Sequence, residues 1–411
     1  MIDIILLAAG ALGLVVAALS ERMRRLPVSE PVLAMTAGVL LGPAVAGVLD
    51  LRPLTDDHTW LHPATRILLA VSVMSVALRY PFGAARSRLR PVLILLAVAM
   101  PVMAVVTAGL AALVLGVGLG TAVLLGAALC PTDPVLASSV VTGGPAEEDL
   151  PERDRQILSL ESGANDGLAL PLVLVALAIA GADPLGAAAL ESLWQVAGAV
   201  AVGAATGWLG GRALRAGEEH GSTDPGPRLL FTAVLALAVL GLSGLVHVDG
   251  ILAVFVCGLA FNLVGTGLER TDDAPIDEAV NRFLVLPLFV AFGAVLPWEA
   301  WGELGWRGAA LVVAVLVLRR VPVVWLLRRP LRLGRPDALF LGWFGPIGVS
   351  AIFYLVLEAE RLRLDPVVLA AGTLVVAAST VVHGVTSSPG RVLYRRVASA
   401  DVARSDPADR S

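Results

Sequence analysis

Glu161-Ser162-Gly163-Ala164-Asn165-Asp166 opens a stretch of sequence that is otherwise apolar as far as about Ala180. If this stretch crosses a membrane, two carboxyl groups, a hydroxyl and an amide lie where water is scarce. A charge at that depth costs about 3 kcal/mol on insertion scales and roughly 10 or more in simulations. A membrane helix keeps such groups when they carry ions or protons, or when they pair with an opposite charge. We therefore look for the function in this hexapeptide.

The composition indicates a membrane protein. Of 411 residues, 57% are hydrophobic and 16% charged, against roughly 25% charged residues in soluble domains. Apolar runs of about 18 to 25 residues recur from end to end, which is the length that crosses roughly 30 Å of hydrocarbon. We expect one integral membrane unit over residues 1–390, a short cytoplasmic tail over 391–411, and no nucleic-acid partner. The two cysteines, Cys130 and Cys257, give neither a disulfide framework nor metal-ligand spacing.

The apolar runs predict an all-α polytopic membrane protein with thirteen transmembrane helices, and twelve is the alternative count. The first run lacks the basic start and the cleavage site of a signal peptide, so we expect it to be retained as a helix. The predicted spans are 2–20, 28–48, 60–78, 91–113, 119–142, 157–180, 190–211, 228–246, 249–267, 280–297, 307–327, 337–357 and 365–386.

Arginine placement supports this order and sets an orientation. The loops of one side and the C-terminal tail hold most of the 30 basic residues, all of them arginine. The other side receives only Arg52, Arg361 and Arg363. By the positive-inside rule the arginine-rich side is cytoplasmic, so we expect the N-terminus outside and the C-terminus inside the cell membrane.

Two predicted spans contain helix-breaking sequences. The fifth span contains Pro131-Thr132-Asp133-Pro134, whose two prolines remove two amide donors. The twelfth span contains Gly342-Trp-Phe-Gly345-Pro346-Ile347-Gly348-Val-Ser350 at the corresponding place of a second set of helices. Paired broken helices in two repeats indicate the central site of a secondary transporter. Asp133 is placed to neutralise the positive half-helix ends, and a kinked structural helix is the alternative.

The two acids of the hexapeptide are expected to differ in role. Helical spacing puts Glu161 beside Asn165, four residues on. The cation for Glu161 is expected to be Arg320 in span eleven, with Arg319 as the alternative. A buried pair of this kind is structural, because each charge is held by the other.

Asp166 is left without an evident basic partner, and the same spacing puts Ser162 beside it. Burial without a counter-charge makes a carboxylate take up a proton easily. A carboxylate also binds small hard cations, which prefer oxygen ligands. One carboxyl group that holds either a proton or a cation is the minimal apparatus of an exchanger. The alternative is that Asp166 only bonds a neighbouring helix.

Together these residues resemble the monovalent cation/proton antiporter family, in its bacterial sodium/proton branch. The resemblance covers all the predicted spans and leaves out only the tail. The matching pieces are Thr132-Asp133-Pro134, Glu161-Ser-Gly-Ala-Asn165-Asp166, the arginine of span eleven, Gly345-Pro-Ile-Gly348 and Val-Val-His383-Gly-Val-Thr.

The resemblance implies a fold of two inverted repeats with two broken, crossing helices, at about 119–142 and 337–357. It also implies a homodimer, in which a dimerisation domain stays fixed while a core domain moves like an elevator. No cofactor is implied; the partners are the lipid bilayer, protons and a transported monovalent cation, most simply Na⁺.

The resemblance also assigns roles to individual residues. It makes Asp166 the ion-binding group, with Na⁺ coordinated by the Ser162 hydroxyl and the Thr132 backbone carbonyl. Asp133 balances the half-helix dipoles and reaches the ion through water. Glu161 and Arg320 hold the core together with support from Asn165. The Asn-Asp form, in place of Asp-Asp, is associated with electroneutral exchange of one cation for one proton.

Two departures from the family pattern concern regulation and affinity. Ile347 stands where many relatives have arginine, which leaves gating and pH regulation open. Some archaeal members add a Glu ligand from span three, where this chain offers only Ser72, Met74 and Ser75. His383 could tune a pH response, although packing or capping is the simpler role for it.

Other function classes are weaker. An intramembrane hydrolase would use Ser162 or the Asp133/Asp166 pair, but neither a nearby base nor a nucleophile turn accompanies Ser162 in sequence. A K⁺/H⁺ antiporter and a transport-inactive sensor on the same fold stay open, and the retained Asp166 argues against the sensor.

Overall fold

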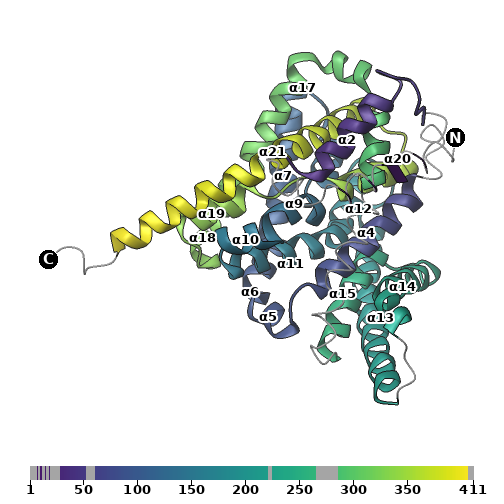
Figure 1. Cartoon of the computed structure of the whole chain (residues 1–411). Helices are drawn as coiled ribbons and strands as arrows, with labels where there is room; N and C mark the ends of the chain where they lie inside the picture. The colour runs from purple at the N-terminus through teal and green to yellow at the C-terminus, as the bar shows by residue number, and fades with distance from the viewer. Residues whose placement is uncertain are drawn as a thin grey trace.

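The computed structural model describes residues 28–51, 61–220, 225–264 and 286–405, together with isolated positions before residue 20. Within these ranges the regular elements are helices and no strand occurs. Figure 1 shows them gathered in one bundle, from which the C-terminal part of α21 (Pro366–Ser405) projects. The predicted all-α class is confirmed for the described residues.

Most predicted spans correspond to one helix or to a pair of shorter helices. The predicted span 2–20 lies outside the described residues apart from isolated positions, and the described part of 280–297 is a helix at 286–294. Five helical stretches of the described chain are long and apolar enough to cross a membrane, and several shorter apolar helices accompany them. The count of thirteen spans therefore stays a prediction.

The helices of the first half of the chain are α2 (Glu30–Leu41), α4 (Leu61–Leu78), α5 (Phe82–Ser87), α6 (Leu89–Ile94), η1 (Leu95–Ala99), α7 (Met100–Leu115), α8 (Leu119–Ala128), α9 (Pro134–Val141), α10 (Gly144–Asp149), α11 (Glu152–Leu168) and α12 (Leu170–Ile179). They continue with α13 (Leu185–Glu219), α14 (Pro225–Leu245), α15 (Gly250–Val264), α17 (Trp298–Leu318), α18 (Val321–Leu331), α19 (Arg335–Trp343), α20 (Val349–Arg361) and α21.

Both predicted helix breaks are present. The fifth span is divided into α8 and α9, with residues 129–133 between them. The twelfth span is divided into α19 and α20, with residues 344–348 between them. Prolines lie in or directly after each connecting segment, where their missing N–H groups cannot continue the helical hydrogen bonds.

Two more spans are interrupted where continuous helices are expected. The sixth span changes from α11 to α12 at Ala169, two residues before Pro171. The eleventh span changes from α17 to α18 at Arg319 and Arg320, directly before Val321-Pro322. Each proline lies at the first turn of the following helix, a position that tolerates the missing donor. These two interruptions place Asp166 and both arginines next to irregular backbone.

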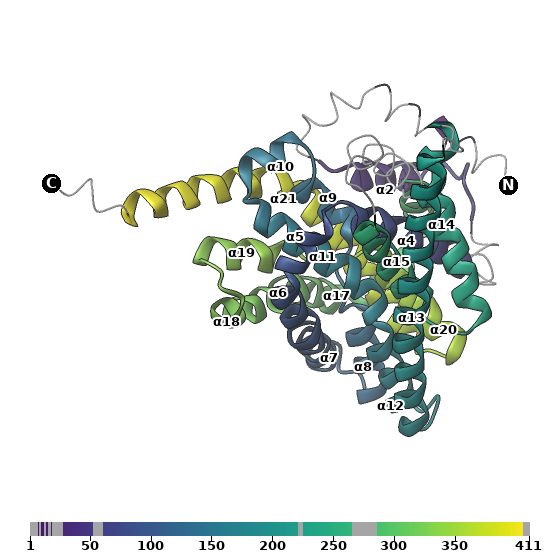
Figure 2. The same cartoon turned by 90° about the horizontal axis from the view of Figure 1, so that it is seen from below.

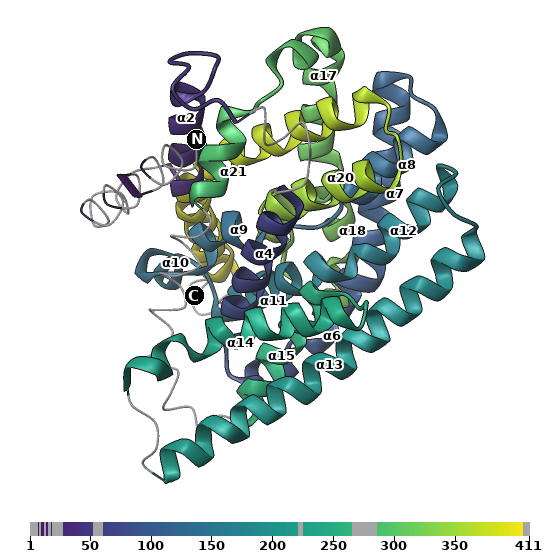
Figure 3. The same cartoon turned by 90° about the vertical axis from the view of Figure 1, so that its right-hand side faces the viewer.

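The two predicted breaks meet in the middle of the bundle. The backbone N–H of Asp133 donates to the carbonyl oxygen of Pro346 at 2.8 Å, which joins one connecting segment to the other. Helix α11 packs against α9, α4 and α15. Figure 2 shows α9 and α11 within the bundle, with α13 and α14 along one side. In Figure 3, α13 is a long helix at the edge, and it packs mainly against α15.

Close backbone approach at two glycines holds this centre together. A methyl group at Gly167 of α11 would lie 2.6 Å from the backbone nitrogen of Leu252 in α15. A methyl group at Gly348, directly before α20, would collide with the carboxyl group of Asp133. Glycine therefore allows α11 to contact α15, and the second break to contact the first, at distances that no other residue permits.

Candidate functional site

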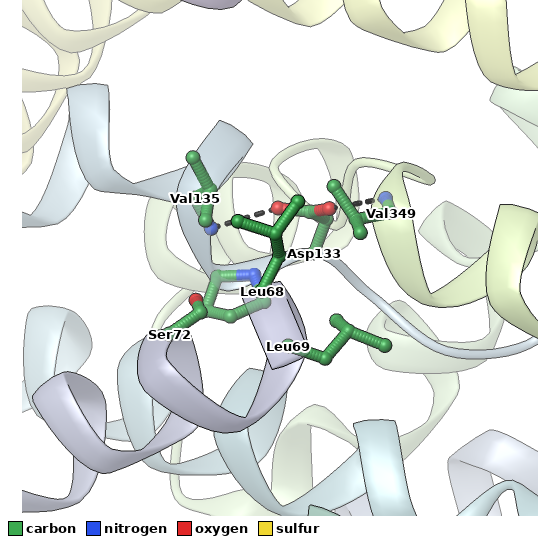
Figure 4. A pocket seen from close by; sticks show the side chains of 7 residues that line it. Leu68, Leu69, Ser72, Asp133, Val135 and Val349 are labelled. Atoms are coloured by element: carbon green, nitrogen blue, oxygen red, sulfur yellow. Dashed lines mark hydrogen bonds between the residues drawn. The ribbon is translucent and has the colours of Figure 1, made fainter. Parts of the chain in front are cut away.

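Asp133 caps two helices at once. Its Oδ1 accepts hydrogen bonds from the backbone N–H groups of Val135 and Leu136 at 2.7 and 2.9 Å, which are the first free donors of α9. Its Oδ2 accepts from the N–H of Val349, at the start of α20, at 2.5 Å. Figure 4 shows the carboxyl group between these two helix starts. A negative charge is stabilised there because the N-terminus of each helix carries a partial positive charge.

Glu161 and Arg320 form a buried bidentate pair. The Nη1 and Nη2 atoms of Arg320 donate to Oε1 and Oε2 of Glu161 at 2.8 and 2.9 Å. The Nε of Arg320 donates to the carbonyl of Leu341 at 2.9 Å, so the guanidinium group also ties α19 to this pair. Glu161 is fully buried and Arg320 is 2% exposed. The predicted partner is therefore Arg320, and Arg319 is used elsewhere.

Asn165 links α11 to the first break. Its Nδ2 donates to Oε1 of Glu161 at 3.1 Å and to Oγ1 of Thr132 at 2.7 Å, while its Oδ1 accepts from the N–H of Thr132 at 3.2 Å. The hydroxyls of Thr132 and Ser162 lie 3.0 Å apart. The amide thus uses both its donor and acceptor sides to hold Thr132 against α11. The nearest partner of the Ser162 hydroxyl is another hydroxyl, which gives no support to a hydrolase.

Asp166 differs from every other acid of the centre. Its side chain is fully buried, and within the described part of the chain neither carboxylate oxygen has a hydrogen-bond partner. Its backbone carbonyl accepts a hydrogen bond from the Tyr354 hydroxyl of α20, which also reaches the Gly167 carbonyl at 3.3 Å. The Gly167 carbonyl cannot make its usual helical hydrogen bond, because Pro171, four residues on, has no N–H. Tyr354 therefore fixes the Asp166 backbone and leaves its carboxyl group unoccupied.

Ser350 is a site residue that the sequence analysis does not single out. It lies in the first turn of α20, is fully buried, and its hydroxyl faces the Asp166 carboxyl group. Neither group makes a hydrogen bond of standard geometry with a described residue. The sequence offers a signal for it, because Ser350 lies two residues after Gly348 in the second broken helix.

Arg319, the alternative partner of Glu161 in the sequence, has a different role in the structure. Its Nη1 donates to the carbonyl oxygens of Leu129, Cys130 and Pro131, at 2.5, 3.3 and 3.3 Å, at the end of α8. Its Nη2 donates to the carbonyl of Gly345 after α19. The C-terminus of a helix carries a partial negative charge, so this cation neutralises two helix ends. Both arginines are therefore used inside the bundle, where each is 2% exposed.

His383 and Ile347 are joined on the other side of the second break. The N–H of Ile347 donates to the Ser379 hydroxyl at 2.8 Å, and that hydroxyl lies 3.1 Å from Nδ1 of His383. The Nε2 of His383 lies 3.0 Å from the Trp343 carbonyl, the last residue of α19. His383 therefore has the expected capping contact, and Ile347 is fully buried where an arginine would need a partner.

A narrow crevice, with no room for a water molecule, lies beside Asp133. Of the three polar or sulfur-containing side chains expected from span three, only Ser72 lines it, and its hydroxyl has no hydrogen-bond partner among the described residues. Figure 4 shows Ser72 on α4 below the Asp133 carboxyl group. The other lining residues are Leu68, Leu69, Pro134, Val135 and Val349.

Comparisons with known proteins agree with this architecture. The sequence matches the family described as "Sodium/hydrogen exchanger, transmembrane" over residues 11–390. Na(+)/H(+) antiporter 2 of Zygosaccharomyces rouxii is 30% identical over 356 residues, which cover 82% of this chain and 44% of that protein. The Na(+)/H(+) antiporter of Schizosaccharomyces pombe is 30% identical over 364 residues, which cover 84% of this chain and 76% of that protein.

A solved structure has the same fold. The sodium proton antiporter MjNhaP1 from Methanocaldococcus jannaschii matches with a TM-score of 0.77 and 17% identity, over 96% of this chain and 97% of that one. The chain spans less than half the length of the Zygosaccharomyces rouxii relative. The family match nevertheless includes every residue of the centre described above, from Ser72 to His383. The chain is a polytopic helical membrane protein and belongs to the transmembrane sodium/hydrogen exchanger family.

Proposed function

We propose that this protein exchanges a monovalent cation, most simply Na⁺, for H⁺ across the membrane. The observation that carries the proposal is the unpaired carboxyl group of Asp166 beside two broken helices. Every other acid of the centre is already satisfied, Glu161 by Arg320 and Asp133 by three backbone N–H groups. Asp166 therefore remains to hold the proton or the cation, one at a time.

The proposed cation ligands are oxygen atoms, as a hard monovalent ion requires. They are the Asp166 carboxylate, the Ser162 hydroxyl one helical turn before it, and the backbone carbonyl of Thr132. Asn165 supports this set by holding Thr132 against α11. Asp133 contributes at longer range, through water, since both its oxygens already accept backbone hydrogen bonds. Transport of this kind needs no resident cofactor.

We propose a stoichiometry of one cation for one proton. Asn165 is neutral and Glu161 is compensated by Arg320, so Asp166 is the one uncompensated charge that these residues offer to an ion. Protonation of Asp166 and binding of one monovalent cation then leave the same net charge in the centre. The exchange is accordingly electroneutral.

Alternating access is proposed to occur by an elevator movement. The two breaks are joined by the Asp133–Pro346 hydrogen bond and by the side chain of Asp133, which favours movement of the whole centre as one body. A fixed dimerisation domain in a homodimer would give that body a frame to move against. We place the protein in the cell membrane with its N-terminus outside and C-terminus inside, following the arginine distribution.

The test uses everted membrane vesicles with a pH-sensitive dye. Addition of Na⁺ should release protons from vesicles that contain the wild-type protein, and Asp166→Asn should abolish that signal. Glu360→Gln is the matched control, because Glu360 is a partly exposed carboxylate that pairs with His62. An absent Na⁺ response, or full activity of Asp166→Asn, would refute the proposal. Parallel additions of Li⁺ and K⁺ distinguish a K⁺/H⁺ antiporter from a Na⁺/H⁺ antiporter. If none of the three cations releases protons, the result would indicate a sensor.

A further inference from the structure

The end of α18 carries a group of arginines to which the proposed exchange assigns no role. Four arginines lie within eight residues there, and we call them the α18 arginine cluster: Arg328, Arg329, Arg332 and Arg335. The last three side chains are exposed. None of the four forms an ion pair with an acidic residue in the parts of the chain that the structure describes. The cluster therefore offers concentrated positive charge to a ligand from outside the chain.

A further arginine joins the cluster, and the acid closest to it in sequence has other partners. The Nη2 of Arg153, in α11, donates to the Leu331 carbonyl at 2.7 Å, which brings a fifth guanidinium group to the end of α18. The carboxylate of Asp337 accepts from the Gly334 N–H at 3.0 Å and from the Tyr394 hydroxyl at 2.7 Å. The hydrogen bond of Arg153 also joins the end of α18 to α11.

The cluster lies at the depth expected for a membrane surface. Transporter ion sites lie near the middle of the bilayer, and Arg320, which binds Glu161 in the centre, directly precedes α18. At about 1.5 Å per residue along a helix, Arg328 and Arg332 lie roughly 12 and 18 Å from Arg320. Half of a hydrocarbon layer of roughly 30 Å is about 15 Å. In Figures 1 and 2, α18 and α19 lie at the edge of the bundle, on the side from which α21 projects and which we expect to be cytoplasmic.

Exposed apolar side chains accompany the arginines. Leu326 of α18 is 77% exposed and Leu339 of α19 is 50% exposed. The Arg328 guanidinium lies 4.4 Å from the ring centroid of Trp325, and its Nη1 donates to the Trp325 carbonyl at 3.2 Å. Tryptophan and arginine side chains in this arrangement are typical of the interface between membrane and water. Guanidinium groups beside exposed leucines match a ligand that has both an anionic headgroup and acyl chains, whereas a soluble anion would use the charges alone.

We propose that the α18 arginine cluster binds the headgroup of an anionic phospholipid, whose acyl chains lie along Leu326 and Leu339. Basic clusters directly beyond a transmembrane helix attract anionic lipids, and a planar guanidinium group can donate two parallel hydrogen bonds to phosphate oxygens. The bound lipid holds the far end of α18, which begins beside Arg320, and through Arg153 it holds the start of α11. It therefore anchors two helices of the ion centre to the membrane surface. The inference does not depend on which ion the centre exchanges.

The test measures how defined lipids stabilise the delipidated full-length protein in detergent. Phosphatidylglycerol should raise the melting temperature of the wild-type protein, whereas phosphatidylcholine, whose phosphate is neutralised by its own choline, should not. One variant replaces the whole cluster: Arg328→Gln, Arg329→Gln, Arg332→Gln and Arg335→Gln. Without lipid it should melt like the wild-type protein, and it should need about tenfold more phosphatidylglycerol, or more, for the same rise. An unchanged response overturns the proposal, and so does an equal rise with inorganic phosphate, which would make the ligand a free anion.

A charge-matched control separates the cluster from the net charge of the protein. It carries four substitutions at exposed arginines on different parts of the chain: Arg212→Gln, Arg307→Gln, Arg363→Gln and Arg396→Gln. The Arg212 guanidinium also lies 4.4 Å from the ring centroid of a tryptophan, Trp208, so the control includes a pair like that of Arg328 and Trp325. The control should keep the wild-type response to phosphatidylglycerol. An equal loss of response in both variants overturns the cluster as a binding site.

Native mass spectrometry counts bound lipids independently of melting. A milder variant, Arg329→Gln combined with Arg332→Gln, changes two exposed side chains and serves if the fourfold cluster variant fails to fold. At a phosphatidylglycerol concentration that loads the wild-type protein, this variant should retain at least one lipid molecule fewer. Equal retention by the two proteins overturns the proposal.

Discussion

Asp133 and Arg319 bind opposite ends of the same two broken helices. Asp133 accepts from the first N–H groups of α9 and α20, and Arg319 donates to carbonyl groups of the connecting segments that follow α8 and α19. Each break therefore has its positive end neutralised by an acid and its negative end neutralised by a base. The freed polar groups are satisfied inside the protein, which is the condition for irregular backbone at membrane depth.

Arg319→Gln should destabilise the protein strongly. It leaves several buried carbonyl groups without their donor, and each unsatisfied group costs about 1–3 kcal/mol. The melting temperature of the purified protein in detergent should fall by several degrees, whereas Arg335→Gln, at an exposed helix start, should leave it unchanged. Equal melting temperatures for the two variants would contradict the capping role.

Loss of one partner of the Glu161–Arg320 pair should lower the stability of the protein more than loss of both. Glu161→Gln or Arg320→Gln leaves an uncompensated buried charge, which costs about 3–5 kcal/mol. The double variant removes both charges and should recover part of the lost stability. Thermal unfolding of the four proteins gives a double-mutant cycle, and additive losses would mean that the two charges do not interact.

Ser162→Ala should weaken cation binding without removing proton uptake. Loss of one oxygen ligand is expected to raise the KM for Na⁺ about tenfold, which corresponds to about 1.4 kcal/mol. Ser192→Ala on the edge helix α13 is the control, because its hydroxyl only bonds the carbonyl one turn earlier. Vesicle transport at a series of Na⁺ concentrations measures the change, and an unaltered KM would remove Ser162 from the ligand set.

Gly348→Ala should separate the two breaks. The added methyl group meets the Asp133 carboxyl group, so the backbone must move, at a cost of about 1–3 kcal/mol. Gly241→Ala in α14 adds the same atom where nothing lies within 4 Å, and should be neutral or stabilising. Transport rate and melting temperature should both fall for the first variant alone. A normal Gly348→Ala protein would show that close contact between the breaks is dispensable.

Protons and Na⁺ should compete for Asp166. As the pH falls, the protonated fraction of Asp166 rises, so the apparent KM for Na⁺ should rise while the maximal rate at saturating Na⁺ changes less. Measurement of KM at several pH values, with equal pH on both sides of the membrane, tests this. A KM for Na⁺ that does not depend on pH would mean that the two ions bind at different places.

The fold and much of the centre are predictable from sequence because the cues are local. A proline pair marks the first break, a single proline between glycines marks the second, and apolar runs mark the spans. The four-residue spacing of Glu161 and Asn165 places their side chains next to each other on one helix. The buried charge of Glu161 predicts that an intramembrane arginine pairs with it. Span number is less accessible, since several helices of the described chain are too short to be identified as membrane-crossing by length alone.

The contributions of Arg319 and Ser350 depend on distances between separate helices. Whether Arg319 or Arg320 pairs with Glu161 depends on the directions of their side chains, and these directions are set by the helix interruption before Pro322. Ser350 lies two residues after Gly348 in the sequence, but the direction of its side chain towards Asp166 depends on how α20 packs in the bundle. Pro131 and Pro134 leave backbone carbonyl groups of the break without helical donors. These carbonyl groups indicate a need for a second cation, in addition to the one that pairs with Glu161.

The Asn165 amide has a consequence for the way the membrane potential acts on the protein. In the proposed one-for-one exchange, an amide in that place keeps the centre at one net charge, whether it is loaded with H⁺ or with Na⁺. An electric field across the membrane then exerts the same force on both loaded forms and favours neither direction of exchange. Transport would come to rest when the Na⁺ ratio across the membrane equals the H⁺ ratio, so the voltage of the cell would supply no work. A cell relying on this protein would be limited in its Na⁺ gradient by its pH gradient alone.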